Sequence, residues 1–226
     1  MTLRARIYIG TVSIAGAMLI AGSLLLATSP MSEPLKFLHC AALALLTSTF
    51  KVRLPGTRSS VSTSFVLFLV AISQLSFAEA LLLTIPATLL QCVWKTRKWP
   101  TAAQMIFNVT ATLVNTSIAA LVYSAVIRAG SPVPALVMAA TSFFFVGSLL
   151  VSGIISITQS APFGRIWLQC DRWALPYYVG GAILAVLVGA YAQLQGLHLA
   201  LAMLTGLLLL YVWYQNRVSA VAESQT

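Results

Sequence analysis

The sequence predicts an all-α, polytopic integral membrane protein: a bundle of about eight transmembrane helices with both termini in the cytoplasm. Three observations predict this class. Of the 226 residues, 59% are hydrophobic and 8% are charged, and the mean hydropathy is +0.93, which lies far outside the range of soluble domains. The apolar residues form long continuous runs, unlike the short alternating segments of membrane β-barrels. The basic residues, finally, gather on one side of the predicted membrane.

Eight apolar runs are candidate spanning helices, because crossing a bilayer takes about 20 mostly apolar residues in helical form. They cover residues 7–28, 35–50, 61–77, 79–93, 102–127, 135–157, 177–193 and 198–214. The runs at 35–50 and 79–93 are short, so whether they cross completely is open. Arg4 and Arg6 precede the first run as in a secretory signal, but this run is long and lacks a clear cleavage site. We therefore treat it as a helix.

The charges orient this bundle. With eight spans the two termini share a side, and the positive-inside rule places them in the cytoplasm of a bacterial inner membrane. Eleven of the thirteen Lys and Arg residues then lie inside, and only Lys36 and Arg128 lie outside. The tryptophans, which favour the headgroup region, fall at the cytoplasmic helix ends: Trp94, Trp99, Trp167, Trp173 and Trp213. The net charge of +9 thus reflects topology and attraction to membrane lipid, and nucleic-acid binding is not expected.

The chain is expected to hold one transmembrane domain, residues 1–217, followed by a short polar cytoplasmic tail, residues 218–226. The polar and aromatic interval 158–176 is typical of a helix that lies in the membrane interface. Small residues recur at four-residue spacing, which predicts close helix packing. They are Ser13, Ala17 and Ala21 in the first run, and Gly181, Ala185 and Gly189 in the seventh. A homo-oligomer is an alternative use of these faces.

A polar stripe in the run 102–127 is the clearest candidate binding feature. At about 100° per residue, Gln104, Asn108 and Asn115 fall within an arc of about 40° on one helix face. Polar side chains within a bilayer are costly unless they are partnered or face a cavity. The stripe therefore indicates either hydrogen bonds between helices or a path for a ligand or ion.

A second group of polar residues is expected on the outer side of the membrane. Its members are His39, Gln74, Glu79, Gln193, Gln195 and His198. Glu79 is an acid at the edge of an apolar span, where it either favours the helix N-terminus or lines an outward-facing pocket with a histidine. In the same run Pro86 is expected to kink the helix beside that pocket.

Signatures of catalysis and of cofactor binding are absent from the sequence. No nucleophile-elbow, HExxH, Walker or dinucleotide-binding pattern occurs, and the two histidines and four acids supply few proton-transfer groups. The histidines and acids are too dispersed to predict a metal site. We expect no enzyme, no catalytic residue and no cofactor, although an intramembrane hydrolase of unfamiliar arrangement is a minor alternative.

Several motifs in order resemble those of a known module. They are KVRLPG from Lys51, a serine-containing stretch that ends at Phe65, ISQLSFAEALLL, ATLLQCVWK and IFNVTATLVNTSIAALVY. Together, over about residues 48–125, they resemble the membrane-embedded N-terminal sensor regions of the MASE type that precede HD-GYP or GGDEF domains in bacterial signalling proteins. The resemblance implies a bundle that senses a ligand or a membrane state and signals to a cytoplasmic enzyme. No output domain is present in this chain.

Two hypotheses about function follow. The first is a non-enzymatic, sensor-like module that binds a small or lipophilic ligand within the bundle and acts through a separate cytoplasmic signalling protein. The alternative is a small-molecule transporter or a substrate-capture membrane subunit. The basic loop with Lys51, Arg53, Pro55 and Gly56 is either a coupling element, as the resemblance implies, or a tight turn that fixes topology.

Overall fold

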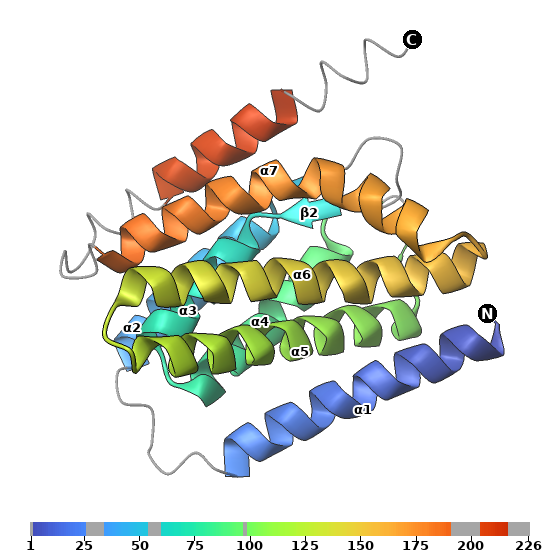
Figure 1. The fold of residues 1–226 in the computed structure, drawn as a ribbon, viewed down its shortest axis with the longest axis horizontal. Coiled ribbons are helices and arrows are strands. Elements are labelled where there is room, and N and C mark those ends of the chain that lie inside the picture. Colours follow the sequence, from blue (N-terminus) through green and yellow to red (C-terminus); the bar gives the residue numbers. More distant parts are fainter. Residues whose placement is uncertain (1, 26–33, 54–59, 97–98, 191–203, 217–226) are drawn as a thin grey trace.

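The structure, a computed structural model, describes residues 2–25, 34–53, 60–96, 99–190 and 204–216. Within these ranges the chain is helical apart from one short β-ladder. The elements are α1 (Leu3–Leu25), α2 (Pro34–Ser48), β1 (Lys51–Arg53), β2 (Ser60–Ser62), α3 (Ser64–Gln74), α4 (Phe77–Val93), α5 (Ala102–Ile127), α6 (Pro132–Gln159) and α7 (Phe163–Ala190). Residues 204–216 form a further helix. Figure 1 shows α5, α6 and α7 side by side in alternating directions, with α1 along the outer edge of α5.

Among the described residues, three helices are long and apolar enough to cross a membrane, namely α1, α5 and α6. They agree with the predicted membrane character of the chain. Helices α2, α3 and α4 have 15, 11 and 17 residues, and at about 1.5 Å per residue none of them reaches the ~30 Å of a hydrocarbon core. The bundle therefore combines long helices with helices that traverse only part of its depth.

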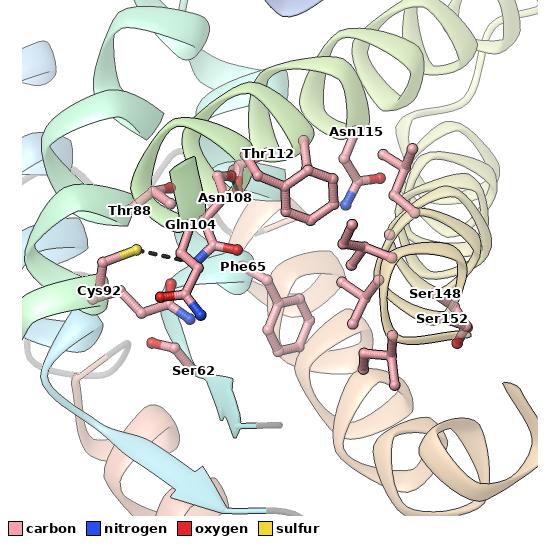
Figure 2. Close-up of a pocket in the computed structure, with 18 of the residues that line it drawn as sticks. Ser62, Phe65, Thr88, Cys92, Gln104, Asn108, Thr112, Asn115, Ser148 and Ser152 are labelled. Atoms are coloured by element: carbon pink, nitrogen blue, oxygen red, sulfur yellow. Dashed lines mark hydrogen bonds between the residues drawn. The ribbon is translucent and has the colours of Figure 1, made fainter. Parts of the chain in front are cut away.

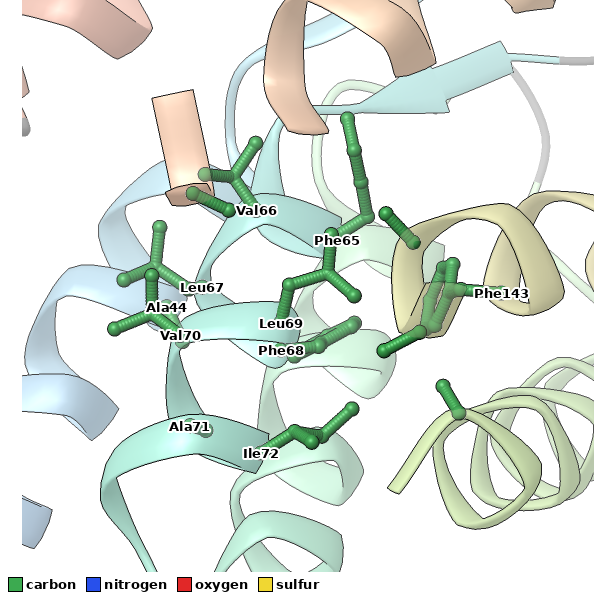
Figure 3. Close-up of a cluster of buried hydrophobic side chains, with 14 of the residues drawn as sticks. Ala44, Phe65, Val66, Leu67, Phe68, Leu69, Val70, Ala71, Ile72 and Phe143 are labelled. Carbon is green, nitrogen blue, oxygen red and sulfur yellow. The ribbon is translucent and has the colours of Figure 1, made fainter. Parts of the chain in front are cut away.

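Helix α3 lies at the centre of the bundle. Every residue from Ser64 to Ile72 is buried, and α3 contacts α2, α4, α5, α6 and α7. A helix that is apolar on all sides can pack against neighbouring helices on all sides, as α3 does. Figure 3 shows its side chains pointing in every direction, with Phe143 of α6 facing Phe68.

Helix α7 can approach α3 closely because it carries a glycine at the contact. A Cβ atom on Gly181 would lie 2.0 Å from Cζ of Phe65, and Ala185, one turn further, is also buried. This face of small residues thus packs within the bundle. In α1 the expected face is not the one that packs: Ala17 and Ala21 are exposed, whereas Gly16 lies against Thr110 of α5.

Buried hydroxyl groups hold the start of α3 against the end of α2. The Thr47 carbonyl oxygen accepts hydrogen bonds from the side chains of Ser62, at 3.2 Å, and Thr63, at 3.0 Å. All three residues are buried. Polar backbone at the end of a short buried helix needs such partners, since water and lipid cannot supply them there.

Two of the expected boundaries are wrong. The run 61–77 was expected to be one helix, but Ser60–Ser62 pair with Lys51–Arg53 as an antiparallel ladder, and α3 ends at Gln74. The interval 158–176 was expected to be a separate interfacial helix, but from Phe163 onward it belongs to α7, which continues through Pro176. Figure 1 shows α7 bending near its middle, as expected where proline removes a backbone hydrogen bond. Helix α4 likewise continues through Pro86.

Gly181→Ala should destabilise the bundle, because the added methyl group would overlap the Phe65 ring and overpacking of this kind costs about 1–3 kcal/mol. Thermal melting of the detergent-solubilised protein measures the effect. Gly10→Ala is the matched control, since its Cβ would meet nothing within 4 Å. Equal melting temperatures for the two variants would contradict the central position of α3.

Candidate ligand cavity

A cavity of about 1070 Å³ opens among α3, α4, α5, α6 and α7, beside the β-ladder. Its lining mixes aromatic rings with polar groups (Figure 2). The amide and charged side chains in the lining are Gln91, Gln104, Asn108, Asn115, Gln159, Asp171 and Lys51. This combination of an apolar body and a few polar groups is typical of sites for small molecules.

The polar stripe of α5 lines this cavity. Gln104 and Asn108 are exposed, and Asn115 is buried further along the helix. The Asn108 side-chain nitrogen donates to the Cys92 sulfur of α4, at 3.2 Å. The Gln104 side-chain carbonyl oxygen accepts from the Thr101 backbone N–H, at 2.9 Å, within a capping box at the start of α5. Gln104 therefore also has a structural role that its spacing from Thr101 signals.

Asn115 forms the buried end of the stripe. Its side-chain nitrogen lies 2.8 Å from the position that a Cβ on Gly147 would occupy, so the amide packs directly on the α6 backbone (Figure 2). The residue is only 5% exposed, yet its side-chain oxygen has no hydrogen-bond partner within the described part of the chain. A buried acceptor without a donor is costly, which distinguishes Asn115 from an ordinary hydrogen bond between helices.

Sequence reasoning did not include Asp171 among the candidates. The Ser148 hydroxyl of α6 donates to the Asp171 carboxylate, and both residues line the cavity. The sequence analysis considers only Glu79 as an acid at the edge of an apolar span. The structure shows that Asp171 also belongs to a long, largely apolar helix, α7. A usable signal existed: extending the buried positions Tyr177 and Ala174 of α7 toward its start brings residues 170 and 171 to the same face.

Asp171 lies within α7, before its apolar stretch 174–188. Its partner Ser148 lies well inside the membrane-length helix α6. Within the ranges that the structure describes, no basic side chain forms an ion pair with it. The carboxylate thus carries a charge that the protein neutralises only in part.

The described members of the expected outer group, His39, Gln74 and Glu79, do not line this cavity. Glu79 closes a capping box with Ser76, whose backbone N–H and hydroxyl both donate to its carboxylate, at 2.9 and 2.6 Å. His39 is exposed and its Nδ1 lies 2.7 Å from the Leu35 carbonyl oxygen, while Gln74 is half-buried at the end of α3. Gln193, Gln195 and His198 lie outside the described residues. In the part of the chain that the structure describes, no three His, Cys, Asp or Glu residues gather as for a metal ion.

The basic loop is described only at its base. Lys51 and Arg53 lie in β1, paired with Ser62 and Ser60 of β2, whereas Pro55 and Gly56 fall outside the described residues. The Lys51 ammonium donates to the Trp94 carbonyl oxygen at the end of α4, at 2.9 Å. Lys51 also lines the cavity, so the ladder connects the loop to the cavity wall.

No protein-family model matches the sequence, and no curated protein or solved structure is significantly similar to it.

Asp171→Asn should not lower stability at neutral pH. A carboxylate without a basic partner among the described residues costs free energy when it leaves water, and the neutral amide lowers that cost while its oxygen can still accept from Ser148. Melting temperatures in detergent at pH 7 should show the variant at or above the wild type. A variant clearly less stable would mean that the carboxylate stabilises the fold.

Proposed function

We propose that this chain is a multi-pass protein of the bacterial inner membrane that binds a small or lipophilic ligand in the cavity and catalyses no reaction. It acts as a sensor-like module and signals through a separate cytoplasmic protein, as its resemblance to membrane-embedded sensor regions implies. The observation that carries the proposal is Asn115, a buried amide in the lining of a cavity large enough for a small molecule, whose oxygen has no donor among the described residues.

The arrangement of the helices supports the proposed orientation with cytoplasmic termini, although α2, α3 and α4 are too short for the expected count of eight full spans. The α5–α6 connection, which holds Arg128, lies at the opposite end of the bundle from the N-terminus, while the α6–α7 connection lies at the same end as the N-terminus (Figure 1). Arg4, Arg6 and Arg165 belong to that shared end by their positions in the chain. One end of the bundle is thus richer in basic residues, as the positive-inside rule expects of a cytoplasmic face.

A transporter or a substrate-capture subunit is the second candidate. Short helices that traverse part of the membrane beside a polar cavity, such as α3, are a feature of transporters. The buried side chains of α3 fill the centre of the bundle, which argues against the net movement of a substrate through it. Uptake assays in proteoliposomes distinguish the two, since a transporter moves substrate, alone or with an energising partner, and a sensor only binds it.

Cysteine labelling in intact cells tests the orientation. In a background without Cys40, Cys92 and Cys170, a membrane-impermeant maleimide should modify Ser131→Cys, in the α5–α6 connection, and not Thr96→Cys, after α4. Both positions are exposed, so permeabilised cells, in which both should react, provide the control. Labelling of Thr96→Cys from outside would reverse the orientation.

Asn115→Leu should remove ligand binding and leave the bundle folded. The amide oxygen accepts no hydrogen bond from the described residues, so its loss leaves no neighbour unsatisfied, whereas a ligand donor would lose its acceptor and affinity should fall by about tenfold or more. Native mass spectrometry of the purified protein, with and without the substitution, measures a co-purified compound. Thermal melting of both samples shows whether folding is retained.

The opposite result identifies an interhelical role. If a compound stays bound to Asn115→Leu while the melting temperature falls, Asn115 stabilises helix packing and does not recognise ligand. Thr112→Val is a matched control on the same helix, since the Thr112 hydroxyl already donates to the Asn108 carbonyl at 2.8 Å. This variant should retain the compound.

A further inference from the structure

The chemistry of the cavity wall formed by α6 and α7 limits which ligand can bind. Besides Tyr178, the polar residues of these two helices that line the cavity are Ser148, Ser152, Thr158, Gln159 and Asp171. The Ser148 hydroxyl donates its hydrogen bond to the Asp171 carboxylate. The Ser152 hydroxyl is fully buried and has no hydrogen-bond partner among the described residues. Asn115, also in the cavity lining, packs against the same stretch of α6 through Gly147.

The unsatisfied groups on this wall are mainly hydrogen-bond acceptors. A carboxylate offers about four acceptor positions, of which Ser148 occupies one. The Asn115 oxygen receives no donor from the described part of the chain. An acceptor-rich wall whose carboxylate lacks a basic partner within those same ranges is complementary to a ligand that brings positive charge.

Aromatic rings continue this wall along α7. Tyr178 lies seven residues, or two helical turns, after Asp171, on the same helix face. Its ring centroid lies 4.4 Å from that of Phe65, 5.2 Å from Phe144 and 6.4 Å from Phe143, and all four rings line the cavity. Aromatic faces attract cations, most strongly where water is excluded.

The cavity lining also includes a basic side chain, that of Lys51, on a different wall from Asp171. Lys51 lines the wall that belongs to the β-ladder and α4, where its ammonium donates to the Trp94 carbonyl oxygen. A ligand whose positive end lies between Asp171 and the rings would contact a different set of elements, α3, α6 and α7.

We propose that the ligand is an organic ammonium ion, with its charged nitrogen held by Asp171 beside the ring cluster of Phe65, Phe143, Phe144 and Tyr178. This inference rests on the proposed function and names the class of compound that the cavity takes. An apolar or uncharged remainder of the ligand extends toward the α5 stripe, where Asn115 accepts a hydrogen bond.

Calorimetric titration of the full-length protein in lipid nanodiscs tests the charge requirement with matched probes. Choline is compared with 3,3-dimethylbutan-1-ol, its uncharged carbon isostere, and phenethylammonium with 2-phenylethanol. At least one ammonium compound should bind about tenfold or more tightly than its neutral counterpart. Asp171→Asn should remove that preference, while Asp171→Glu, which keeps the charge, should retain part of it. Glu79→Gln is the control, since Glu79 lies outside the cavity lining, and it should leave both affinities unchanged.

Binding of the neutral probes as tightly as the ammonium probes, or an unchanged ammonium affinity in Asp171→Asn, would overturn the inference while leaving a ligand-binding cavity in place. If no probe of either kind binds and no compound co-purifies with the wild type, the proposed function itself fails. Should Asp171→Asn not fold, the comparison of each ammonium probe with its isostere on the wild-type protein decides the question alone.

Discussion

A helix of 11 residues such as α3 cannot cross a bilayer, and it cannot satisfy the polar groups at its own ends. Neighbouring helices must therefore surround α3 within the membrane and supply hydrogen-bond partners for its ends. In lipid this coverage gains little from the hydrophobic effect, because lipid tails are as apolar as the side chains they replace. It must come from close packing, which is why Phe65 fits against a glycine of α7. The positions of α2, α4, α5, α6 and α7 all follow from covering this one helix.

The same constraint produces the cavity. Irregular backbone is tolerated at membrane depth only where protein or a polar cavity surrounds it. The start of α3 meets both conditions, since Ser62 and Thr63 bond to the Thr47 carbonyl and Ser62, Ser64 and Phe65 line the cavity. Because α3 begins partway along the bundle, the long helices α5, α6 and α7 extend past it, and the space between them carries the polar groups.

Helical periodicity alone predicted the stripe of Gln104, Asn108 and Asn115, because a polar face within an apolar run must meet either a neighbouring helix or a cavity. The spacings Ser76–Glu79 and Thr101–Gln104 also signal capping boxes, which accounts for Glu79 without an outer pocket. Asp171 was not predicted because the interval 158–176 is typical of a separate interfacial helix. The structure continues this interval into α7 through Pro176, where α7 packs against α3 and α6, and local sequence does not specify this packing.

Hydroxyl groups alone would not identify this cavity as a binding site, since unpartnered buried hydroxyls also occur on Ser13 and Thr116 within the described ranges, and neither residue is in its lining. An amide and a carboxylate carry more weight, because each loses more than a hydroxyl when it leaves water. One oxygen of Glu79 is also buried without a partner among the described residues, but the other closes a capping box at a helix start. Asp171 has no basic partner within the described ranges, and the Asn115 oxygen accepts no hydrogen bond there. Groups that cost stability in this way are characteristic of functional sites, and in this chain both of them border the same space.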